Sequence, residues 1–326
     1  MSTVPISDDA AVEPRRRPDF FVVGQPKSGT TALYEMLRQH PQIYMPDLKE
    51  PEFFAADLRR RFPPRIGGAL PETLEEYLDL FRPAEPGQVL GEASVFYLRS
   101  HVAAQQIAEV NPAARIIAIL REPSELLRSL HLQLIYDHIE TVKDFRTALS
   151  LEDQRRQGEA IPRSSHQPQL LLYSENVRYV DQLKRFHAVF PREQVTVLLY
   201  DEFLGDNDRA LHHIFRFLDV DDAVSVAPSK ANPSTFLRSA FAEDLVHRVS
   251  VGRGPVERVV KGATKRILST RTRRTLLDRA YRSLHAAPLP VDPDLMAELR
   301  VRFAPEVANL SDYLDRDVAS AWGYEL

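Results

Sequence analysis

Short apolar runs alternate along the chain with longer segments whose apolar residues recur at helical spacing. Residues 20–23, 115–120 and 195–199 are nearly continuous apolar runs, as in parallel strands buried on both faces, and residues 89–98 resemble a further strand and turn. Helices are predicted over residues 30–37, 74–80, 103–110, 173–190 and 206–218, and after Pro123. The alternation predicts an α/β fold with a central, mostly parallel sheet flanked by helices, which binds ligands at the carboxyl ends of its strands.

A glycine-containing loop joins the first predicted strand to the first helix. The stretch FFVVGQPKSGTTAL places Gly24 and Gly29 between the strand and a helix that begins at Thr30. Backbone N–H groups of such a loop converge with the positive end of the helix dipole, and the hydroxyls of Ser28, Thr30 and Thr31 add donors. The loop therefore predicts a phosphate site.

The position of the lysine separates this loop from the usual triphosphate loop G-x-x-x-x-G-K-[ST]. Gly24 and Gly29 keep the frame, but Thr30 stands where the lysine should be, and Lys27 precedes the second glycine by two residues. This arrangement suits a nucleotide with one 5′-phosphate and a transferable group. The alternative is an ordinary strand–helix turn with an incidental lysine.

The segment PKSGTTAL resembles the 5′-phosphosulfate loop of sulfotransferases that use 3′-phosphoadenosine 5′-phosphosulfate (PAPS), and the resemblance extends from Phe20 to Trp322. It implies a P-loop-like fold without a catalytic metal. It also implies that Lys27 stabilises the departing 5′-phosphate, which Ser28, Gly29, Thr30 and Thr31 hold. Trp322 would close the core.

Residues 49–54, KEPEFF, resemble the E-P-x-F-F motif of glycan-type members of this family. The match implies that Glu50 is the catalytic base, because an acceptor hydroxyl needs help to lose its proton at neutral pH. The alternative is that Lys49, Glu50 and Glu52 are solvated loop charges. The acceptor expected from this resemblance is a hydroxyl or amine of a small molecule, a glycan, a glycolipid or a glycosylated natural product.

Residues 89–98, VLGEASVFYL, resemble the family's G-E-x-[ST]-P-x-Y-L pattern, with Val95 in place of the proline. Ala93 stands where some glycan sulfotransferases carry a lysine near the sulfate. Glu92 is interpreted either as an ion-pair partner, which we favour, or as a second carboxylate at the acceptor.

An R-[DE]-P…S pattern follows the strand at residues 115–120. Arg121 and Ser129 match the family's 3′-phosphate site, for which the planar, permanently charged guanidinium is well suited. A salt-bridge role for Arg121 is the alternative. The helix at residues 173–190 resembles a family helix whose match, Tyr179, would approach the adenine. His131 and His138, without partners at metal-ligand spacing, are expected to be ordinary packed or surface residues.

Two other function classes compete with sulfuryl transfer. The run VTVLLYDE at residues 195–202 is like the magnesium-holding strand of a kinase or ATPase, but the chain lacks G-K-[ST]. A non-catalytic nucleotide-binding adaptor with the same fold is the second alternative.

Composition narrows the partners. The 326 residues carry a formal net charge of −4, which argues against a nucleic-acid binder, and there is no cysteine for disulfides or thiolate metal sites. No apolar run approaches the length of a membrane span, so a cytoplasmic protein is expected.

We expect a flexible leader at residues 1–18 and a single domain at residues 19–326. Within it, residues 57–88 are expected to form an acceptor-side insertion, residues 150–168 an exposed loop, and residues 227–250 a loop over the nucleotide. Residues 252–290 form a predicted basic helical lid, which would attract an anionic or lipid-linked acceptor or touch a membrane surface. A solvated helix over the core is the alternative for this segment.

Overall fold

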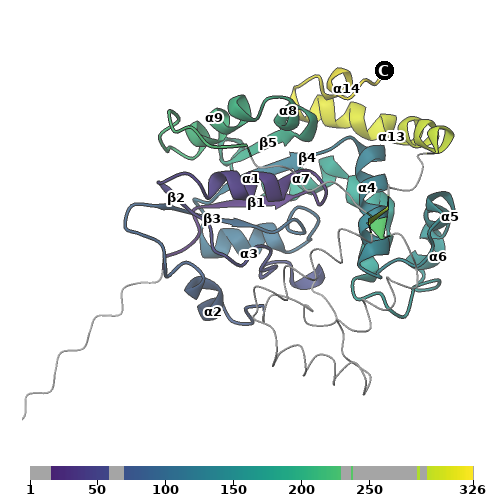
Figure 1. Ribbon diagram of the computed structural model, residues 1–326, viewed down its shortest axis with the longest axis horizontal. Helices are drawn as coiled ribbons and strands as arrows, with labels where there is room; N and C mark the ends of the chain where they lie inside the picture. The colour runs from purple at the N-terminus through teal and green to yellow at the C-terminus, as the bar shows by residue number, and fades with distance from the viewer. Residues whose placement is uncertain (1–15, 59–69, 229–235, 238–284, 287–291, 326) are drawn as a thin grey trace, which may run out of the picture.

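The computed structural model describes residues 16–58, 70–228, 236–237, 285–286 and 292–325. These residues contain a five-stranded sheet in the order β2-β3-β1-β4-β5, in which every neighbouring pair is parallel (Figure 1). The strands are β1 (Phe20–Gly24), β2 (Ile43–Tyr44), β3 (Val89–Ala93), β4 (Arg115–Leu120) and β5 (Val195–Leu199). The strand carrying the glycine loop is thus central.

Helices follow most strands. The α-helices are α1 (Thr30–Leu37), α2 (Leu74–Asp79), α3 (Ala103–Val110), α4 (Pro123–Tyr136), α5 (Phe145–Ser150), α6 (Glu152–Arg156), α7 (Tyr179–His187), α8 (Tyr200–Gly205), α9 (Asn207–Phe217), α13 (Pro293–Leu314) and α14 (Val318–Ala321). Short 3₁₀ turns are η1 (Ala56–Leu58), η2 (Pro168–Leu171), η3 (Tyr173–Val177) and η4 (Arg192–Gln194), and two-residue strands β6 (Phe236–Leu237) and β7 (His285–Ala286) pair antiparallel.

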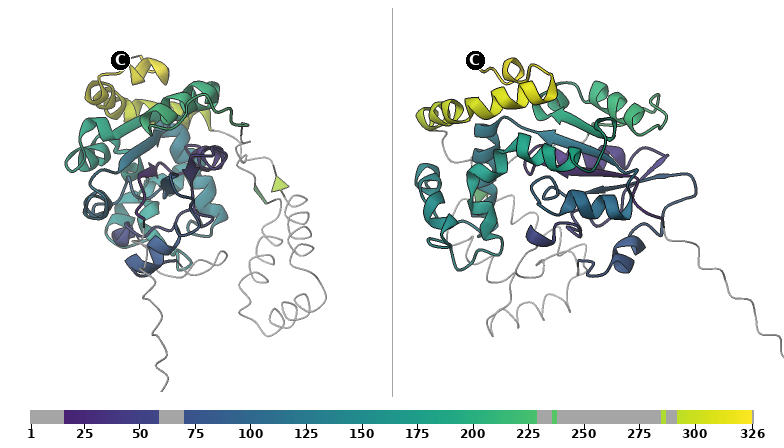
Figure 2. Two further views of the ribbon diagram at one scale, coloured as in Figure 1. Left: turned by 90° about the vertical axis from the view of Figure 1, so that its left-hand side faces the viewer. Right: turned by 180° about the vertical axis from the view of Figure 1, so that it is seen from behind.

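The alternation of side chains along β1 divides the core into two layers. Phe20 and Val22 join an apolar cluster with residues of α1 and α9 on one face of the sheet. Phe21 and Val23 join a larger cluster with residues of α3, α7, α4 and α13 on the other face. Figure 1 and Figure 2 show the two helical layers from opposite sides. The predicted architecture is confirmed, and the carboxyl ends of β1, β3 and β4 lie at one edge of the sheet.

Two segment predictions were wrong. The predicted helix at residues 173–190 is a 3₁₀ turn and a separate helix, because Arg178 adopts φ −77°, ψ 63° between η3 and α7. The predicted exposed loop at residues 150–168 contains α6, whose Arg155 forms a fully buried ion pair with Glu140 at 2.7 Å.

The predicted leader extends three residues too far. Arg16 and Arg17 donate to the carbonyls of Glu85 and Val110, both at 2.8 Å, and Pro18 is buried. Residues 1–15 and the basic segment 252–283 lie outside the described residues, as do Lys230, Asn232 and Arg238 of the predicted nucleotide-covering loop. Within the described part of the chain, no helix combines the length and apolarity needed to cross a bilayer.

Candidate nucleotide and acceptor site

The glycine loop leaves β1 at the carboxyl edge of the sheet, and its backbone requires a glycine before α1. Gly29, the N-cap residue, has φ 82°, in the left-handed region that favours glycine. A β-carbon at this position would lie 3.1 Å from the ring of Tyr200. Gly29 therefore lets the loop turn closely beneath that ring and directs the first N–H groups of α1 into the site.

The loop hydroxyls differ in burial. Ser28 is 0% exposed, and its Oγ has no hydrogen-bond partner among the described residues. Thr30 is also buried, whereas Thr31 is exposed. A buried hydroxyl without a partner is costly, so the Ser28 Oγ fits a site whose acceptor is supplied by a ligand phosphate.

Lys27 is held by α4. Its Nζ donates to Oε1 of Gln133 at 3.1 Å, and its backbone adopts a positive φ of 64°. Burial lowers the pKa of Lys27, Arg121 lowers it further, and the negative charges of Asp137 and Glu50 oppose this shift. A partly dehydrated ammonium interacts more strongly with a phosphate than an exposed one does.

Arg121 follows β4 and binds the same loop. Its guanidinium donates to the Lys27 carbonyl at 3.0 Å and lies over the Tyr200 ring, 4.7 Å from its centroid. Arg121 also pairs with Glu125 at 3.4 Å, so the salt-bridge alternative describes part of its environment. The structure thus brings Arg121 and Lys27 together, as both predicted phosphate roles require.

Ser129 is buried on α4, one turn before the residue that holds Lys27. Its predicted contact with the 3′-phosphate stays a prediction. Tyr179 is 0% exposed; its hydroxyl donates to the Arg121 carbonyl at 2.6 Å, and its ring packs against Trp322. In this arrangement Tyr179 supports Arg121 from the core and presents no surface to an adenine. Trp322 is buried in the larger core cluster, as predicted.

Glu50 lies in the loop after β2. Its N–H donates to the carbonyl of Ala93 at 3.0 Å, which fixes the KEPEFF turn to the end of β3. Its carboxylate forms an ion pair with Lys49 and is close enough to raise the pKa of Lys27. Glu50 is partly exposed and therefore accessible to an acceptor. Its role as the base stays a prediction.

Glu92, near the end of β3, forms hydrogen bonds with hydroxyl groups among the described residues, and not the ion pair favoured from the sequence. Its carboxylate is 1% exposed and accepts hydrogen bonds from Tyr77 at 2.9 Å and Tyr97 at 2.8 Å. Burial raises the pKa of Glu92 to about 7, although hydrogen bonds from Ser94 and the tyrosines and the charge of Lys49 oppose the shift. Among the described residues its carboxylate is therefore held by hydroxyl groups in the protein interior.

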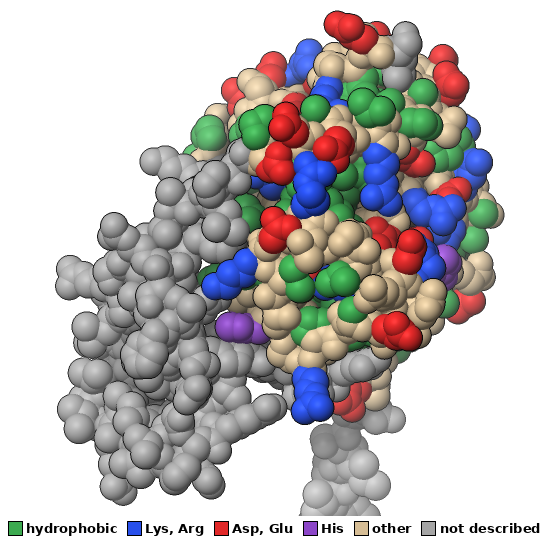
Figure 3. Space-filling model, turned by 90° about the vertical axis from the view of Figure 1, so that its right-hand side faces the viewer, with side chains coloured by type: hydrophobic (Ala, Val, Ile, Leu, Met, Phe, Trp, Pro, Cys, Tyr) green, Lys and Arg blue, Asp and Glu red, His purple; other side chains and the backbone are tan. Residues whose placement is uncertain are grey.

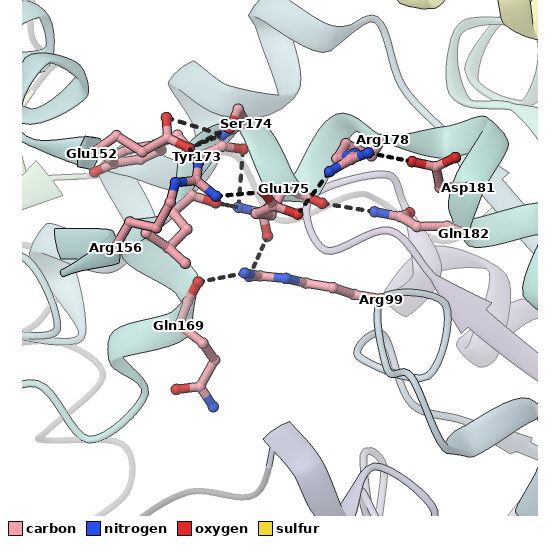
Figure 4. A network of polar contacts seen from close by, with 12 residues as sticks. Arg99, Glu152, Arg156, Gln169, Tyr173, Ser174, Glu175, Arg178, Asp181 and Gln182 are labelled. Atoms are coloured by element: carbon pink, nitrogen blue, oxygen red, sulfur yellow. Dashed lines mark hydrogen bonds and ion pairs between the residues drawn. The ribbon is translucent and has the colours of Figure 1, made fainter. Parts of the chain in front are cut away.

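A polar network supports the loop from beneath. The buried Gln25 amide donates to Gln182 of α7, which in turn donates to the Glu175 carbonyl at 2.9 Å. Figure 4 shows Gln182 and Glu175 with Arg99, which donates to Asn176 at 2.9 Å. The network ties the glycine loop to η3 and α7.

Two residues of the site, Gln133 and Tyr200, were not predicted from the sequence. Gln133 lies four residues after Ser129, on the same helix face, and Tyr200 follows directly after β5. Both spacings were visible in the sequence, but neither residue belongs to the motifs that indicate a phosphate site.

His131 is a packed residue, as expected. Its Nδ1 pairs with the Tyr173 hydroxyl at 2.8 Å, its Nε2 pairs with the Lys143 carbonyl at 3.1 Å, and burial lowers its pKa. His138 is half-buried, with a positive φ of 56°.

Within the described ranges, no group of three or more potential ligands gathers as a metal site would require. On the face shown in Figure 3, Lys and Arg side chains are interspersed with Asp and Glu.

Comparison with known proteins decides the family. The sulfotransferase family model matches residues 18–223, well over half of the chain. The chain belongs to the sulfotransferase family. The match covers the glycine loop, the KEPEFF turn and Arg121, and it confirms the resemblance found in the sequence.

Individual sulfotransferases show the extent of the similarity. Carbohydrate sulfotransferase 15 of Mus musculus is 27% identical over 250 residues, covering 62% of this chain and 44% of that protein. Bifunctional heparan sulfate N-deacetylase/N-sulfotransferase 4 of Mus musculus is 36% identical over 117 residues, covering 33% of this chain and 12% of that protein.

The crystal structure of a sulfotransferase from Alicyclobacillus acidocaldarius is 29% identical, with a TM-score of 0.66, and the match covers 94% of this chain and 99% of that one. This sulfotransferase therefore shares its fold with the present chain over nearly its whole length, and the P-loop-like fold prediction is confirmed. By contrast, the chain spans less than half the length of the curated relatives it matches.

Proposed function

We propose that this sulfotransferase transfers the sulfuryl group of PAPS to a hydroxyl or amine of its acceptor. The observation that carries the proposal is the contact between Arg121 and the Lys27 carbonyl at 3.0 Å. It joins a residue matched to the 3′-phosphate site with the loop matched to the 5′-phosphosulfate site. The buried Ser28 hydroxyl and the N-terminus of α1 support a phosphate at that loop.

The reaction assigns one role to each charged side chain. Glu50 takes the acceptor proton as the acceptor oxygen or nitrogen attacks sulfur, and the bond between sulfur and the 5′-phosphate oxygen breaks. Lys27 stabilises the charge that develops on that departing oxygen, which leaves as adenosine 3′,5′-bisphosphate. Catalysis rests on positioning and on charge stabilisation within a partly dehydrated site.

A carbohydrate-bearing molecule is the acceptor class that we propose. The KEPEFF resemblance to glycan-type members supports it, as do the names of the carbohydrate and heparan sulfate sulfotransferases that the chain resembles. A cytoplasmic location and contact of the basic segment 252–283 with a membrane or an anionic acceptor remain further proposals.

Titration calorimetry tests the nucleotide assignment. Adenosine 3′,5′-bisphosphate is expected to bind at least tenfold more tightly than adenosine 5′-phosphate, and more tightly than ATP with Mg²⁺. Equal affinity for the two adenosine phosphates would contradict the 3′-phosphate assignment, and preference for ATP with Mg²⁺ would favour a kinase.

Three substitutions separate the roles kinetically. Lys27→Ala should chiefly lower kcat, by about 10²–10³-fold, as for loss of one charge-stabilising donor. Arg121→Ala should chiefly raise the KM for PAPS.

Glu50→Gln should lower kcat by about 10²–10⁴-fold and leave nucleotide binding nearly intact, as for loss of a general base. Full activity of Glu50→Gln would require a different base.

A further inference from the structure

The side chain of Gln133 connects Lys27 to the end of α4. Its Oε1 accepts from Lys27 Nζ at 3.1 Å, while its Nε2 donates to Oδ2 of Asp137 at 3.0 Å. An ammonium can only donate and a carboxylate can only accept, so both partners require the same orientation of the amide. Asp137 therefore directs the amide oxygen at Lys27.

The backbone makes the Gln133–Asp137 pair part of the helix end. Asp137 is the C-cap of α4, and its N–H donates to the Gln133 carbonyl at 2.8 Å. Residues four apart share a helix face, and the carboxyl end of a helix favours a nearby cation. Side-chain spacing and the helix dipole both favour an ammonium at this end of α4.

The charged groups around Lys27 come from three elements. Asp137 lies at the end of α4, Arg121 follows β4 and Glu50 lies in the loop after β2. Burial lowers the pKa of Lys27, and the negative charge of Asp137 raises it. The carboxylate of Glu50 also pairs with Lys49. The positive charge of Arg121 lowers the pKa of Lys27. Asp137 thus supplies a negative charge that is linked to Lys27 through the Gln133 amide.

We infer that Gln133 and Asp137 are positioning residues that orient the Lys27 ammonium and supply its negative counter-charge from α4. The inference deepens the proposed function and rests on it for the catalytic meaning of Lys27. It assigns α4 two tasks, because the same helix carries Ser129 one turn earlier. Neither positioning residue is required to touch the nucleotide.

The decisive experiment measures the ionisation of Lys27 without turnover. The full chain is labelled with acetic anhydride between pH 7 and pH 10.5, and modification of Lys27 is followed by peptide mass spectrometry. Asp137→Asn keeps the shape of the side chain but removes its charge, so the labelling midpoint should shift to lower pH. Removing an opposite charge near the ammonium should raise labelling below that midpoint by about tenfold.

Gln133→Met provides the second variant, because it keeps an unbranched side chain and removes the amide. Labelling of Lys27 should again rise below the midpoint. Asp153→Asn and Gln154→Met are matched controls, since both residues are exposed and lie on a different helix, α6. Neither control should change the Lys27 profile.

Kinetics then connect the ionisation of Lys27 to catalysis. In Asp137→Asn the alkaline limb of kcat should move to lower pH in step with labelling, while the KM for PAPS changes less than threefold. Wild-type labelling profiles in both Asp137→Asn and Gln133→Met would overturn the inference. Failure of the wild type to bind adenosine 3′,5′-bisphosphate would instead overturn the proposed function, because labelling does not depend on nucleotide binding.

Discussion

At the scale of single residues, the chain places two carboxylates of different character near the end of β3. Glu50 is partly exposed and paired with Lys49, whereas Glu92 is buried beneath the turn among tyrosine hydroxyls. Burial raises the pKa of Glu92 to about 7. Since the unfolded chain would release this proton near pH 4.5, the folded protein binds it more tightly.

The stability of the fold should therefore fall as pH rises from about 4.5 to about 7 and then level off with respect to Glu92. The contribution amounts to about 3 kcal/mol, from roughly 1.4 kcal/mol per pKa unit. Glu92→Gln keeps the shape and removes the titration, so urea unfolding should show a smaller loss of stability between pH 5 and pH 8. Equal losses in wild type and variant would contradict the pKa assignment.

Residue identity also limited what could be predicted of the site. Lys27, Arg121 and Glu50 belong to spaced motifs, and the structure brings their charges together. Gln133 was missed because a single glutamine on a helix carries no signal until its partner is known. Tyr179 occupies a core position against Trp322, which its place in a matched helix could not distinguish from a position beside the adenine.

At the scale of elements, the junction between the glycine loop and α1 requires a positive φ at Gly29 and room for the Tyr200 ring beside it. Gly29 and Gly158 have nearly the same positive φ, 82° and 85°, but a β-carbon added at Gly29 would meet the Tyr200 ring, whereas one added at Gly158 would meet nothing within 4 Å. Replacing Gly158 by alanine therefore measures the cost of the positive φ alone. The additional cost of the same replacement at Gly29 measures crowding of the new β-carbon against the Tyr200 ring.

Gly158→Ala should lower stability by about 1 kcal/mol, the cost of holding alanine in a left-handed conformation. Gly29→Ala should cost more and should also weaken binding of adenosine 3′,5′-bisphosphate by at least tenfold, because the ring that contacts Arg121 must move. Thermal unfolding and calorimetry measure both effects. Unchanged binding in Gly29→Ala would contradict the assigned loop.

The polar segment at residues 150–168, expected to be an exposed loop, contains α6 and a buried ion pair. Arg155 and Glu140 are both 0% exposed in their side chains, and Tyr173 donates to the same carboxylate at 3.3 Å. Charged residues that pair with one another inside the protein cannot be distinguished in sequence from charged residues in water. The prediction of one helix over residues 173–190 was wrong because the apolar residues keep a helical spacing although the chain turns at Arg178.

Arg155→Ala should destabilise the fold by about 3–5 kcal/mol, because it leaves the Glu140 carboxylate buried without its cation. Arg156→Ala is the matched control. Arg156 is half-exposed and pairs with Glu152 and Glu175, so its loss should cost at most about 1 kcal/mol. Chemical denaturation measures the loss of unfolding free energy in both variants. Similar losses would contradict the assignment of Arg155 and Glu140 as a buried ion pair.

At the scale of the whole molecule, the apolar runs were sufficient for the fold class. Strands buried on both faces give strong, continuous signals, and their alternation with helices predicts a parallel sheet. The strand order was not predictable in the same way, because the runs at residues 20–23, 115–120 and 195–199 are similarly apolar and any of them could have been central. Register likewise depends on contacts between segments that are distant in sequence.

The central position of β1 has a consequence for biosynthesis. Its sheet partners, β3 and β4, begin about 70 and 95 residues later in the chain. At translation rates of about 5–20 residues per second, the FFVV segment leaves the ribosome several seconds before either neighbour can pair with it. During that interval its apolar side chains need protection from other nascent chains, and assembly of the phosphate loop must wait for the second half of the sheet.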